Sequence, residues 1–343
     1  MDVGLVNLGD LEYEKFERGV RFGADWADVS RRIGGRKLGA GHWIVPPGRV
    51  TVPYHAHLVN EELAFVLGGE IWVRLDGREH RLDAGDLVAM PPGPDSAHTF
   101  LNRSDRPANL LLVSTMIDRD VIDYLDSGKR AVRVGHVAGE NETVTLRIRD
   151  DRLLALDDDA YFEFEPVDEP PGPAPETPED RDPRIVTIDL VVEEPYELGP
   201  FRAVRKRVGR VAGARLLGVS QYRVAPGDRT WPYHFQHVNE ELFFVRRGHG
   251  ELRTPDGPRG LRPGDFVLCP PGAGGAHAIR NTGDGPLEVL ALSTMEEPEI
   301  SEYPDSGKIY VLVGAPPGGD ATARQIDLLF RREDAVDYLD GEA

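Results

Sequence analysis

The 343-residue sequence has a single cysteine, Cys269, and this scarcity excludes an intramolecular disulfide. Cys269 ends the apolar run 266–269, which predicts a buried and inert thiol. The sequence also lacks a hydrophobic stretch long enough to span a membrane. The first ten residues show neither the basic start nor the apolar core of a secretory signal. We therefore expect a cytoplasmic protein.

Basic residues are few as well. There are 40 lysines and arginines against 59 aspartates and glutamates, for a formal net charge of −19. A negative field of this size argues against nucleic acid and against an anionic membrane as partners. Residues 150–182 carry thirteen acidic side chains and only two basic ones. The proline- and glutamate-rich stretch 166–183 predicts a solvated linker, whereas 143–148 and 161–164 predict ordered segments that pack on a domain as an arm.

Several catalytic signatures are missing. The sequence has no phosphate-binding glycine loop before a helix, no Gly-x-Ser-x-Gly elbow and no Cys-x-x-Cys zinc pattern. What it does have is 38 glycines and 28 prolines in a chain that is 40% hydrophobic. So many turn-forming residues favour an all-β fold over a helical bundle.

An internal repeat determines the architecture. Residues 53–63 (PYHAHLVNEEL) return as residues 232–242 (PYHFQHVNEEL), 179 positions later. The same offset relates further pairs: Gly69 and Gly248, Gly85 and Gly264, Pro91 and Pro270, His98 and His277, Asn102 and Asn281, Lys129 and Lys308. A register kept over this length indicates one duplicated domain, because the unit is much longer than the roughly 20–50 residues of a solenoid repeat.

Each repeat reads as a series of short strands. Apolar runs such as 63–67, 87–90 and 110–113 are separated by turns, including the hairpin signal Asp76-Gly77. Short strands at regular spacing predict a sandwich or barrel. A helix is expected only near the ends of the chain, for example over 332–339.

The first repeat contains a set of residues suited to metal binding. His55 and His57 are two positions apart, so both imidazoles point to one face of a strand. Glu62 follows five residues later, and His98 comes after the next hairpin and turn. Three imidazoles and a carboxylate that converge inside a barrel form a ligand set for a divalent transition metal.

These residues fall in two motifs that closely resemble those of the cupin superfamily. The first motif comprises Gly48, His55, His57, Glu62 and Gly69. The second comprises Gly85, Pro91, Gly93, His98 and Asn102. The resemblance covers both repeats, and it implies two tandem double-stranded β-helix (jelly-roll) barrels of the bicupin type, each able to hold a metal if its ligands are complete.

The resemblance also gives an expected organisation. We expect an N-terminal cupin barrel over 1–140, an acidic Pro-rich linker or arm over 141–183, and a C-terminal cupin barrel over 184–343. The cofactor would be a divalent transition metal such as Fe, Mn, Ni or Zn, and the ligand a small-molecule substrate. The protein is expected to be a monomer or a homodimer.

The second repeat departs from the motif. Gln236 stands where the first repeat has His57, and His237 is one residue out of phase. The remaining ligand candidates are His234, Glu241 and His277, with Gln236 either a weak oxygen ligand or a hydrogen-bond partner. Two histidines and one carboxylate form the facial triad of non-haem iron oxygenases, and homogentisate dioxygenase is a cupin of this kind. The alternative is a decayed site that serves as scaffold.

Each repeat also has a second glutamate beside its candidate ligand. The six-residue spacing to the following glycine selects Glu62 and Glu241. It leaves Glu61 and Glu240 as expected carboxylates at the rim of each barrel.

Three functions are compatible with these motifs. The first is a metal-dependent oxidoreductase of dioxygenase type that acts on a small organic acid or phenol. The second is a redox-neutral metal enzyme, either a decarboxylase or a sugar isomerase, since bicupin oxalate decarboxylases use three histidines and one glutamate with Mn. The third is a non-catalytic binding or storage cupin. The fold alone does not choose among them.

Overall fold

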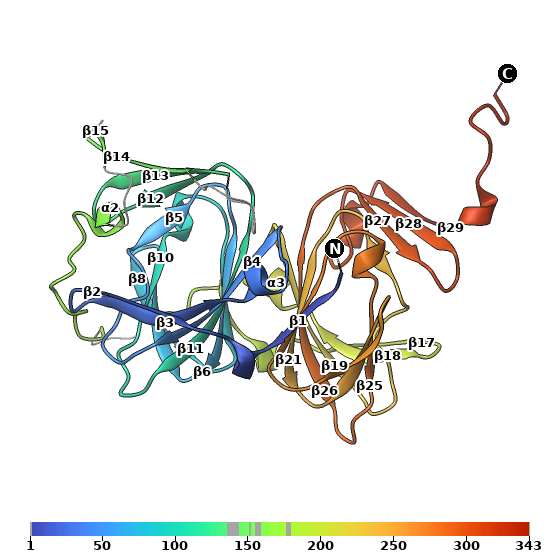
Figure 1. Ribbon diagram of the computed structural model, residues 1–343, viewed down its shortest axis with the longest axis horizontal. Coiled ribbons are helices and arrows are strands. Elements are labelled where there is room, and N and C mark those ends of the chain that lie inside the picture. Colours follow the sequence, from blue (N-terminus) through green and yellow to red (C-terminus); the bar gives the residue numbers. More distant parts are fainter. Residues whose placement is uncertain (1, 136–143, 151, 155–158, 176–179, 343) are drawn as a thin grey trace. The chain divides into compact units, whose positions relative to one another are not determined.

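The computed structural model describes residues 2–135, 144–150, 152–154, 159–175 and 180–342. The chain forms two compact units (Figure 1). The first, here called the N-terminal barrel, contains Leu8–Val192 and Lys206–Leu217. The second, the C-terminal barrel, contains Met1–Asn7, Glu193–Arg205 and Gly218–Ala343. Both consist mainly of antiparallel strands, so the predicted all-β class is confirmed.

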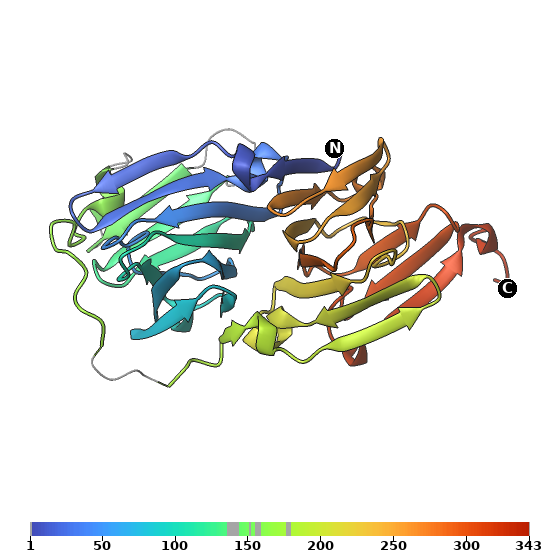
Figure 2. The ribbon, with the colours of Figure 1, turned by 90° about the horizontal axis from the view of Figure 1, so that it is seen from below.

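The N-terminal barrel has two sheets, which are seen from a second side in Figure 2. The larger core sheet has the order β16-β9-β6-β11-β4-β3-β2. Its strands are β2 (Glu14–Arg18), β3 (Phe22–Asp28), β4 (Leu38–Val45), β6 (Glu62–Gly68), β9 (Asp86–Met90), β11 (Ala108–Thr115) and β16 (Ile185–Thr187).

The second sheet of this barrel has the order β15-β14-β13-β12-β5-β10-β7-β8. Its strands are β5 (His55–His57), β7 (Glu70–Leu75), β8 (Arg78–Asp83), β10 (His98–Leu101), β12 (Asp120–Tyr124), β13 (Lys129–Val134), β14 (Val144–Arg149) and β15 (Arg152–Leu153). The short helices of this unit are α1 (Val29–Arg32), α2 (Asp159–Phe162) and α3 (Val208–Ala212).

The C-terminal barrel repeats this plan with three sheets, in the orders β1-β24-β21-β26-β19-β18-β17, β20-β27-β28-β29 and β23-β22-β25. The first contains β1 (Gly4–Asn7), β17 (Glu194–Leu198), β18 (Phe201–Lys206), β19 (Leu217–Val224), β21 (Glu241–Arg247), β24 (Asp265–Cys269) and β26 (Leu287–Thr294). The other two contain β20 (Phe235–Gln236), β22 (Gly250–Thr254), β23 (Gly257–Leu261), β25 (Ala278–Asn281), β27 (Glu299–Tyr303), β28 (Lys308–Val313) and β29 (Ile326–Arg331).

The duplication extends to the edge strands and the cores. Strand β16 pairs with β9 in the N-terminal barrel, as β1 pairs with β24 in the C-terminal barrel. The inward-facing positions of the strands bury aliphatic side chains at the repeat offset, for example Val45 and Val66 in one core and Val224 and Val245 in the other. On β10 the inward face also carries His98, two residues before the core residue Phe100, so the site shares this buried face with the core.

Two expectations about the ends of the repeats have different outcomes. Residues 144–149 form β14, and 159–162 form α2, as expected for ordered segments. The prediction of a helix over 332–339 is wrong. In this range Arg332–Asp334 forms one 3-10 turn, and the remaining residues are not helical. The apolar side chains that would support a helix, Val336 and Tyr338, are 72% and 93% exposed, and a short helix without buried contacts is not stable.

Candidate metal centres

The N-terminal site lies where β5 pairs with two neighbouring strands. His55 and His57 point to one face of β5, and His98 on β10 is the direct cross-strand partner of His55. Glu62 is the first residue of β6, in the other sheet. The structure therefore brings together all four residues that the sequence singles out in this repeat.

The ligand atoms lie at the separations expected around one cation. His55 Nε2 is 3.2 Å from His57 Nε2, and His98 Nε2 is 2.9 Å from Glu62 Oε2. His57 Nε2 is 3.6 Å from Glu62 Oε1. Atoms bound to one ion at about 2.1 Å lie roughly 3 Å apart. The atoms of His55, Glu62 and His98 all lie within 4.8 Å of one another, and His57 adjoins them.

The other ring nitrogen of each histidine has its own hydrogen-bond partner. Nδ1 of His55 donates to the Pro53 carbonyl at 2.9 Å, and Nδ1 of His98 donates to the Ser96 carbonyl at 3.0 Å. Nδ1 of His57 donates to the carboxylate of Asp120. Each of these bonds fixes the tautomer in which the Nε2 lone pair points into the site.

The electrostatics prepare the site for a cation. Burial, together with the neighbouring His98 and His57, lowers the pKa of His55 to about 3, so this imidazole is neutral at pH 7. Burial opposes the ionisation of Glu62, but the charges and hydrogen bonds of the three histidines outweigh it and hold its pKa well below the usual range. Burial lowers the pKa of His57, but the charge of Glu62 and the hydrogen bond to Asp120 outweigh it and raise that pKa above its usual value. A metal therefore binds beside an ionised Glu62 and a neutral His55, and it displaces the extra proton of His57.

Three further residues belong to this site and were missed from the sequence. Asp120 holds His57, and the ring of Tyr124 stacks on His55 with centroids 6.1 Å apart. Arg133 is the cross-strand partner of Asp120, so its side chain lies on the same inner face. The charge of Arg133 acts on His57, and within the described part of the chain its buried Nε has no hydrogen-bond partner.

The C-terminal site contains the three predicted ligands His234, Glu241 and His277. Their ligand atoms lie within 4.8 Å of one another, with His277 Nε2 3.4 Å from Glu241 Oε2. Nδ1 of His234 donates to the Pro232 carbonyl, and Nδ1 of His277 donates to the Gly275 carbonyl, both at 3.0 Å. The backbone support of these two imidazoles is thus the same as in the N-terminal barrel.

Gln236 changes the character of this second site. It hydrogen-bonds to Glu241, while its own Oε1 is buried without a partner among the described residues. Burial and the nearby Glu299 raise the pKa of Glu241 to about 8, against the bond from Gln236. The carboxyl group is therefore neutral at pH 7 without a metal, so a cation must displace a proton to bind here.

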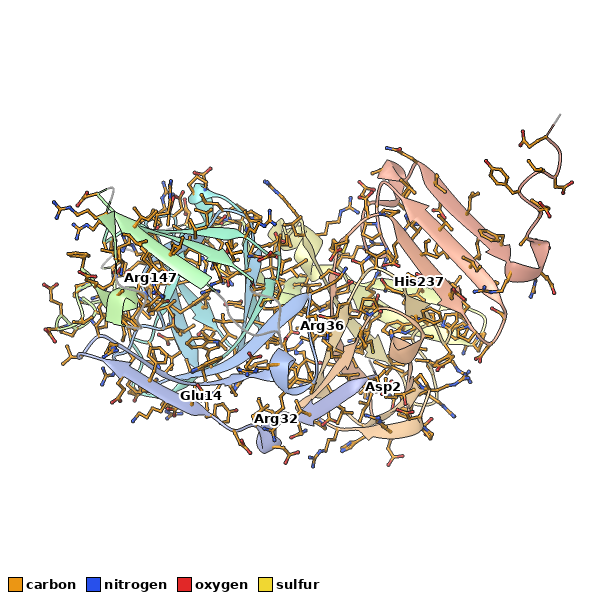
Figure 3. All side chains as sticks on the ribbon, turned by 45° about the horizontal axis from the view of Figure 1, so that its top comes forward. Asp2, Glu14, Arg32, Arg36, Arg147 and His237 are labelled. Atoms are coloured by element: carbon orange, nitrogen blue, oxygen red, sulfur yellow. The ribbon has the colours of Figure 1, made fainter. Side chains whose placement is uncertain are left out.

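His237 is not part of the C-terminal site. Its side chain, labelled in Figure 3, is 42% exposed, and its Nε2 bonds to Glu302 at 2.8 Å. Glu299, which stands at the position of Asp120, instead accepts backbone N–H groups, including those of His237 at 3.0 Å and Asn239 at 2.8 Å. This barrel therefore lacks the third imidazole, and the carboxylate at the position of Asp120 binds backbone N–H groups in place of a histidine ring.

Glu61 is not a rim carboxylate, contrary to expectation. It is fully buried, and its carboxylate accepts the backbone N–H groups of Arg215 at 2.8 Å and Leu217 at 2.7 Å. Glu240 at the equivalent position is also buried. Cys269 is buried as predicted, and burial raises its pKa well above the usual value.

Comparison with known proteins agrees with this geometry. The sequence profile of the cupin domain matches residues 41–114 and 220–293, once in each barrel. The chain belongs to the cupin superfamily. This bicupin is 34% identical to protein SchB of Streptomyces halstedii over 101 residues, which cover 29% of the chain and 70% of SchB. It is 37% identical to the dimethylsulfoniopropionate lyase DddQ of Ruegeria pomeroyi over 83 residues, which cover 23% of the chain and 39% of DddQ.

Solved structures show the same two-barrel fold. The oxalate decarboxylase of Lactobacillus farciminis has a TM-score of 0.52 at 17% identity, over 85% of this chain and 86% of that one. The Bacillus subtilis oxalate decarboxylase has a TM-score of 0.51 at 17% identity, over 85% and 76% of the two chains. None of the helices in the described ranges is long and apolar enough to cross a membrane.

The residues of both sites fit a divalent metal ion. The buried His277 Nε2 and Gln236 Oε1 have no hydrogen-bond partner within the described ranges, and in the N-terminal barrel all three Nε2 atoms face one carboxylate. The donor set of nitrogen and carboxylate oxygen suits Mn, Fe, Ni or Zn and does not select one of them.

Proposed function

We propose that this bicupin is a metal-dependent enzyme that cleaves a small organic acid in its N-terminal barrel without consuming O₂. The observation that carries the proposal is Arg133. A half-buried guanidinium, whose Nε has no hydrogen-bond partner among the described residues, lies on the inner face beside a complete ligand set. Arginine binds carboxylates through paired N–H donors, so Arg133 supplies an anchor for a substrate carboxylate.

The ligand set assigns one role to the metal and others to the chain. His55, His57, Glu62 and His98 would hold a divalent ion, which would supply a Lewis acid for a substrate oxygen. Asp120 orients His57 and increases its basicity as a ligand. Arg133 orients the substrate and offsets the charge of its carboxylate, which makes bond cleavage next to that group easier.

Tyr124 closes the site on the side of His55. Its ring stacks on the imidazole, and burial raises its pKa to about 12, so the phenol stays protonated at neutral pH. Its neighbour Tyr161 contacts it edge-on, with ring centroids 5.7 Å apart. The aromatic pair shields the metal-binding imidazoles from water and keeps their surroundings weakly polar.

The relatives support this reaction class. DddQ is named for a lyase reaction on dimethylsulfoniopropionate, which carries a carboxylate, and its 37% identity exceeds that of the structural neighbours. The oxalate decarboxylases support the fold, and their substrate is also a carboxylic acid. We therefore favour decarboxylation or elimination over the isomerisation of a sugar.

A dioxygenase reaction remains a second candidate, and one observation favours it. His234, Glu241 and His277 form a facial triad in the C-terminal barrel, with an unpartnered Gln236 Oε1 beside it within the described ranges. In that case the chemistry belongs to the C-terminal barrel and requires Fe(II) and O₂. The position of Arg133 is taken by Leu312 there, so an acid substrate would lack its arginine.

The test is a screen of small organic acids with the metal-reconstituted protein under argon and under air. The proposal expects equal turnover in both atmospheres, which falls at least about 100-fold in Arg133→Leu while metal content is unchanged. Leu312→Ala is the matched control in the other barrel and should leave turnover intact. Turnover that needs air and is lost in His234→Ala, with Arg133→Leu unaffected, would contradict it and assign the chemistry to the dioxygenase site.

A further inference from the structure

A cavity of about 360 Å³ opens on the C-terminal barrel. Its wall includes the aromatic residues Phe201, Trp231 and Tyr303, and the basic residues Arg229, Arg280 and Lys308. Tyr303 stacks on the metal-ligand candidate His234, with ring centroids 5.8 Å apart. The cavity therefore adjoins the C-terminal site and is separated from it by one aromatic ring.

The equivalent place on the N-terminal barrel is filled by the chain itself. Phe162 of α2 packs on Phe22, at 5.2 Å between ring centroids, in a cluster with Trp72 and Val167. Phe22 is the residue that matches Phe201 of the cavity wall at the repeat offset. The segment 161–167, here called the plug, thus occupies on one barrel the position that is open on the other.

An ion pair at the edge of the plug fixes it. Lys129 Nζ donates to the Tyr161 carbonyl at 2.6 Å and lies 3.1 Å from Glu165, with both side chains almost completely buried. Lys129 also lies over the ring of Tyr124, at 5.1 Å from its centroid. Lys308 has the same relation to Tyr303, at 5.3 Å, but it lines the open cavity.

The floors of the two places differ in charge. The N-terminal barrel presents Val50 and Leu101 to the plug, whereas the C-terminal barrel has Arg229 and Arg280 at these positions. Both arginines are exposed, in a chain with a net charge of −19. Glu251 and Asp305 also line the cavity, with Asp305 paired to Arg253 at 2.6 Å, so the lining keeps an excess of basic groups. An occupant would therefore combine acidic groups for the arginines with an apolar part for Phe201.

The C-terminal tail of the chain meets both requirements. Residues 338–342 (YLDGE) follow the pattern of residues 161–165 (YFEFE) in the plug: an aromatic residue, an apolar residue, and acidic residues at the third and fifth positions. The tail carries Asp337, Asp340 and Glu342. In the structure Tyr338 and Leu339 make little contact, with exposures of 93% and 69%, and the tail extends away from β29 in Figure 1.

The tail also starts at the edge of the cavity. Arg331 ends β29 opposite Lys308, and the Arg332 N–H donates to the Gly307 carbonyl at 2.9 Å. Tyr338 is seven residue steps beyond Arg331, a stretch that spans up to roughly 23 Å when extended. The N-terminal barrel has the same arrangement. There Ile148, near the end of β14, pairs with Arg130, which is next to Lys129, the equivalent of Lys308.

We propose that the cavity is a binding site for an acidic segment with an aromatic–aliphatic pair, and that its occupant is the C-terminal tail of this chain. Tyr338 and Leu339 would lie on Phe201 and Tyr303, as Tyr161 and Phe162 lie on Tyr124 and Phe22. The acidic residues of the tail would pair with Arg229, Arg280 and Lys308. Docking would cover Tyr303 and with it one side of the C-terminal site. The inference does not depend on the metal chemistry of either barrel.

A peptide-binding experiment tests the proposal. A fluorescent peptide of residues 335–343 is titrated into the full chain and into a chain that ends at Asp334, with a scrambled peptide as control. Because a tethered tail competes at millimolar effective concentration, the peptide should bind the shortened chain at least about 10-fold more tightly than the full chain. Arg229→Val with Arg280→Leu, which installs the N-terminal barrel residues, should weaken binding about 10-fold, and added salt should weaken it further.

A second measurement uses the full chain. In a Cys269→Ser background, Ala278→Cys with Leu339→Cys should form a disulfide within one chain, whereas Ala278→Cys with Ile326→Cys, an exposed position fixed at the far end of β29, should not. Equal peptide binding to the full and shortened chains, binding of the scrambled peptide, or no binding would overturn the proposal. A covalent dimer in place of the intrachain disulfide would contradict it too, since the occupant would then be the tail of a second copy.

Discussion

The two barrels of this bicupin share a fold and differ at three linked positions of their metal sites. The N-terminal barrel has His57, its partner Asp120, and Arg133 across the strand pair from Asp120. The C-terminal barrel has Gln236, Glu299 and Leu312 at the same places. The loss of one imidazole is thus accompanied by a carboxylate that binds backbone N–H groups instead of a ring, and by the loss of the arginine beside it. Of the two sites, the N-terminal one keeps the four-residue ligand set, and the C-terminal one keeps three of the four residues.

The largest effect is expected for the buried lysine that holds the plug. Lys129→Met should destabilise the N-terminal barrel by about 3–5 kcal/mol, because it leaves the buried carboxylate of Glu165 without its partner. Lys308→Met, at the matched position beside the open cavity, should lower the free energy of unfolding by less than about 0.5 kcal/mol. Urea unfolding followed by tryptophan fluorescence measures both, and equal costs would mean that the plug does not bury this ion pair.

Exchange of the third imidazole should come next. His57→Gln is expected to weaken metal binding in the N-terminal barrel about 100-fold, or about 3 kcal/mol, because a strong nitrogen ligand is replaced by a weak amide oxygen. Gln236→His should strengthen the C-terminal site by a smaller factor, since Glu299 is engaged with backbone amides and does not orient the new ring. Calorimetric titration with Mn²⁺ or Zn²⁺ measures the metal affinity of both variants. If the loss in His57→Gln equalled the gain in Gln236→His, orientation of the imidazole by a carboxylate would contribute nothing to affinity.

A smaller effect is expected for Asp120→Asn. An amide in place of the carboxylate orients His57 less well, so metal affinity should fall about 10- to 100-fold. Asp123→Asn on the same strand is the matched control, because Asp123 pairs with Arg130 on the surface and should leave affinity unchanged. If both variants bind metal like the parent, the role given to Asp120 is wrong.

The smallest effect concerns acid stability away from the metal sites. Burial lowers the pKa of His42 to about 4, and Gln221 stands at its position in the C-terminal barrel. Because the folded pKa lies below the unfolded value of about 6.5, neutral His42 contributes stability that is complete above pH 6.5 and is lost as pH falls towards 4. Between pH 7 and 5.5, the free energy of unfolding should therefore fall by about 1 kcal/mol less in His42→Gln than in the parent. Thermal unfolding at the two pH values would show it, and identical pH profiles would contradict it.

Much of the fold and ligand set could be predicted from the sequence, because the repeat offset and the spacing of His55, His57, Glu62 and His98 are local signals. Asp120 and Arg133 were missed because they lie outside the two motifs, on strands whose register is determined by long-range pairing. The offset of 179 carries a signal for Asp120 and Tyr124, since it aligns them with Glu299 and Tyr303. It carries none for Arg133, which aligns with Leu312.

The incorrect prediction of a helix over 332–339 has a different cause. Its apolar residues suggest a helix face, but in the structure they contact no core, and the sequence alone does not report burial. The buried role of Glu61 was also invisible, because its partners are the backbone N–H groups of Arg215 to Leu217, more than 150 residues away.

We propose that the N-terminal barrel holds the metal on which the function depends, and counting the bound ions tests this. Protein purified without added metal is dialysed against a weak chelator, and its metal content is measured by plasma mass spectrometry for the parent, Glu62→Gln and Glu241→Gln. We expect about one ion per chain in the parent and in Glu241→Gln, and almost none in Glu62→Gln. An ion retained in Glu62→Gln and lost in Glu241→Gln would contradict it and transfer the site to the C-terminal barrel.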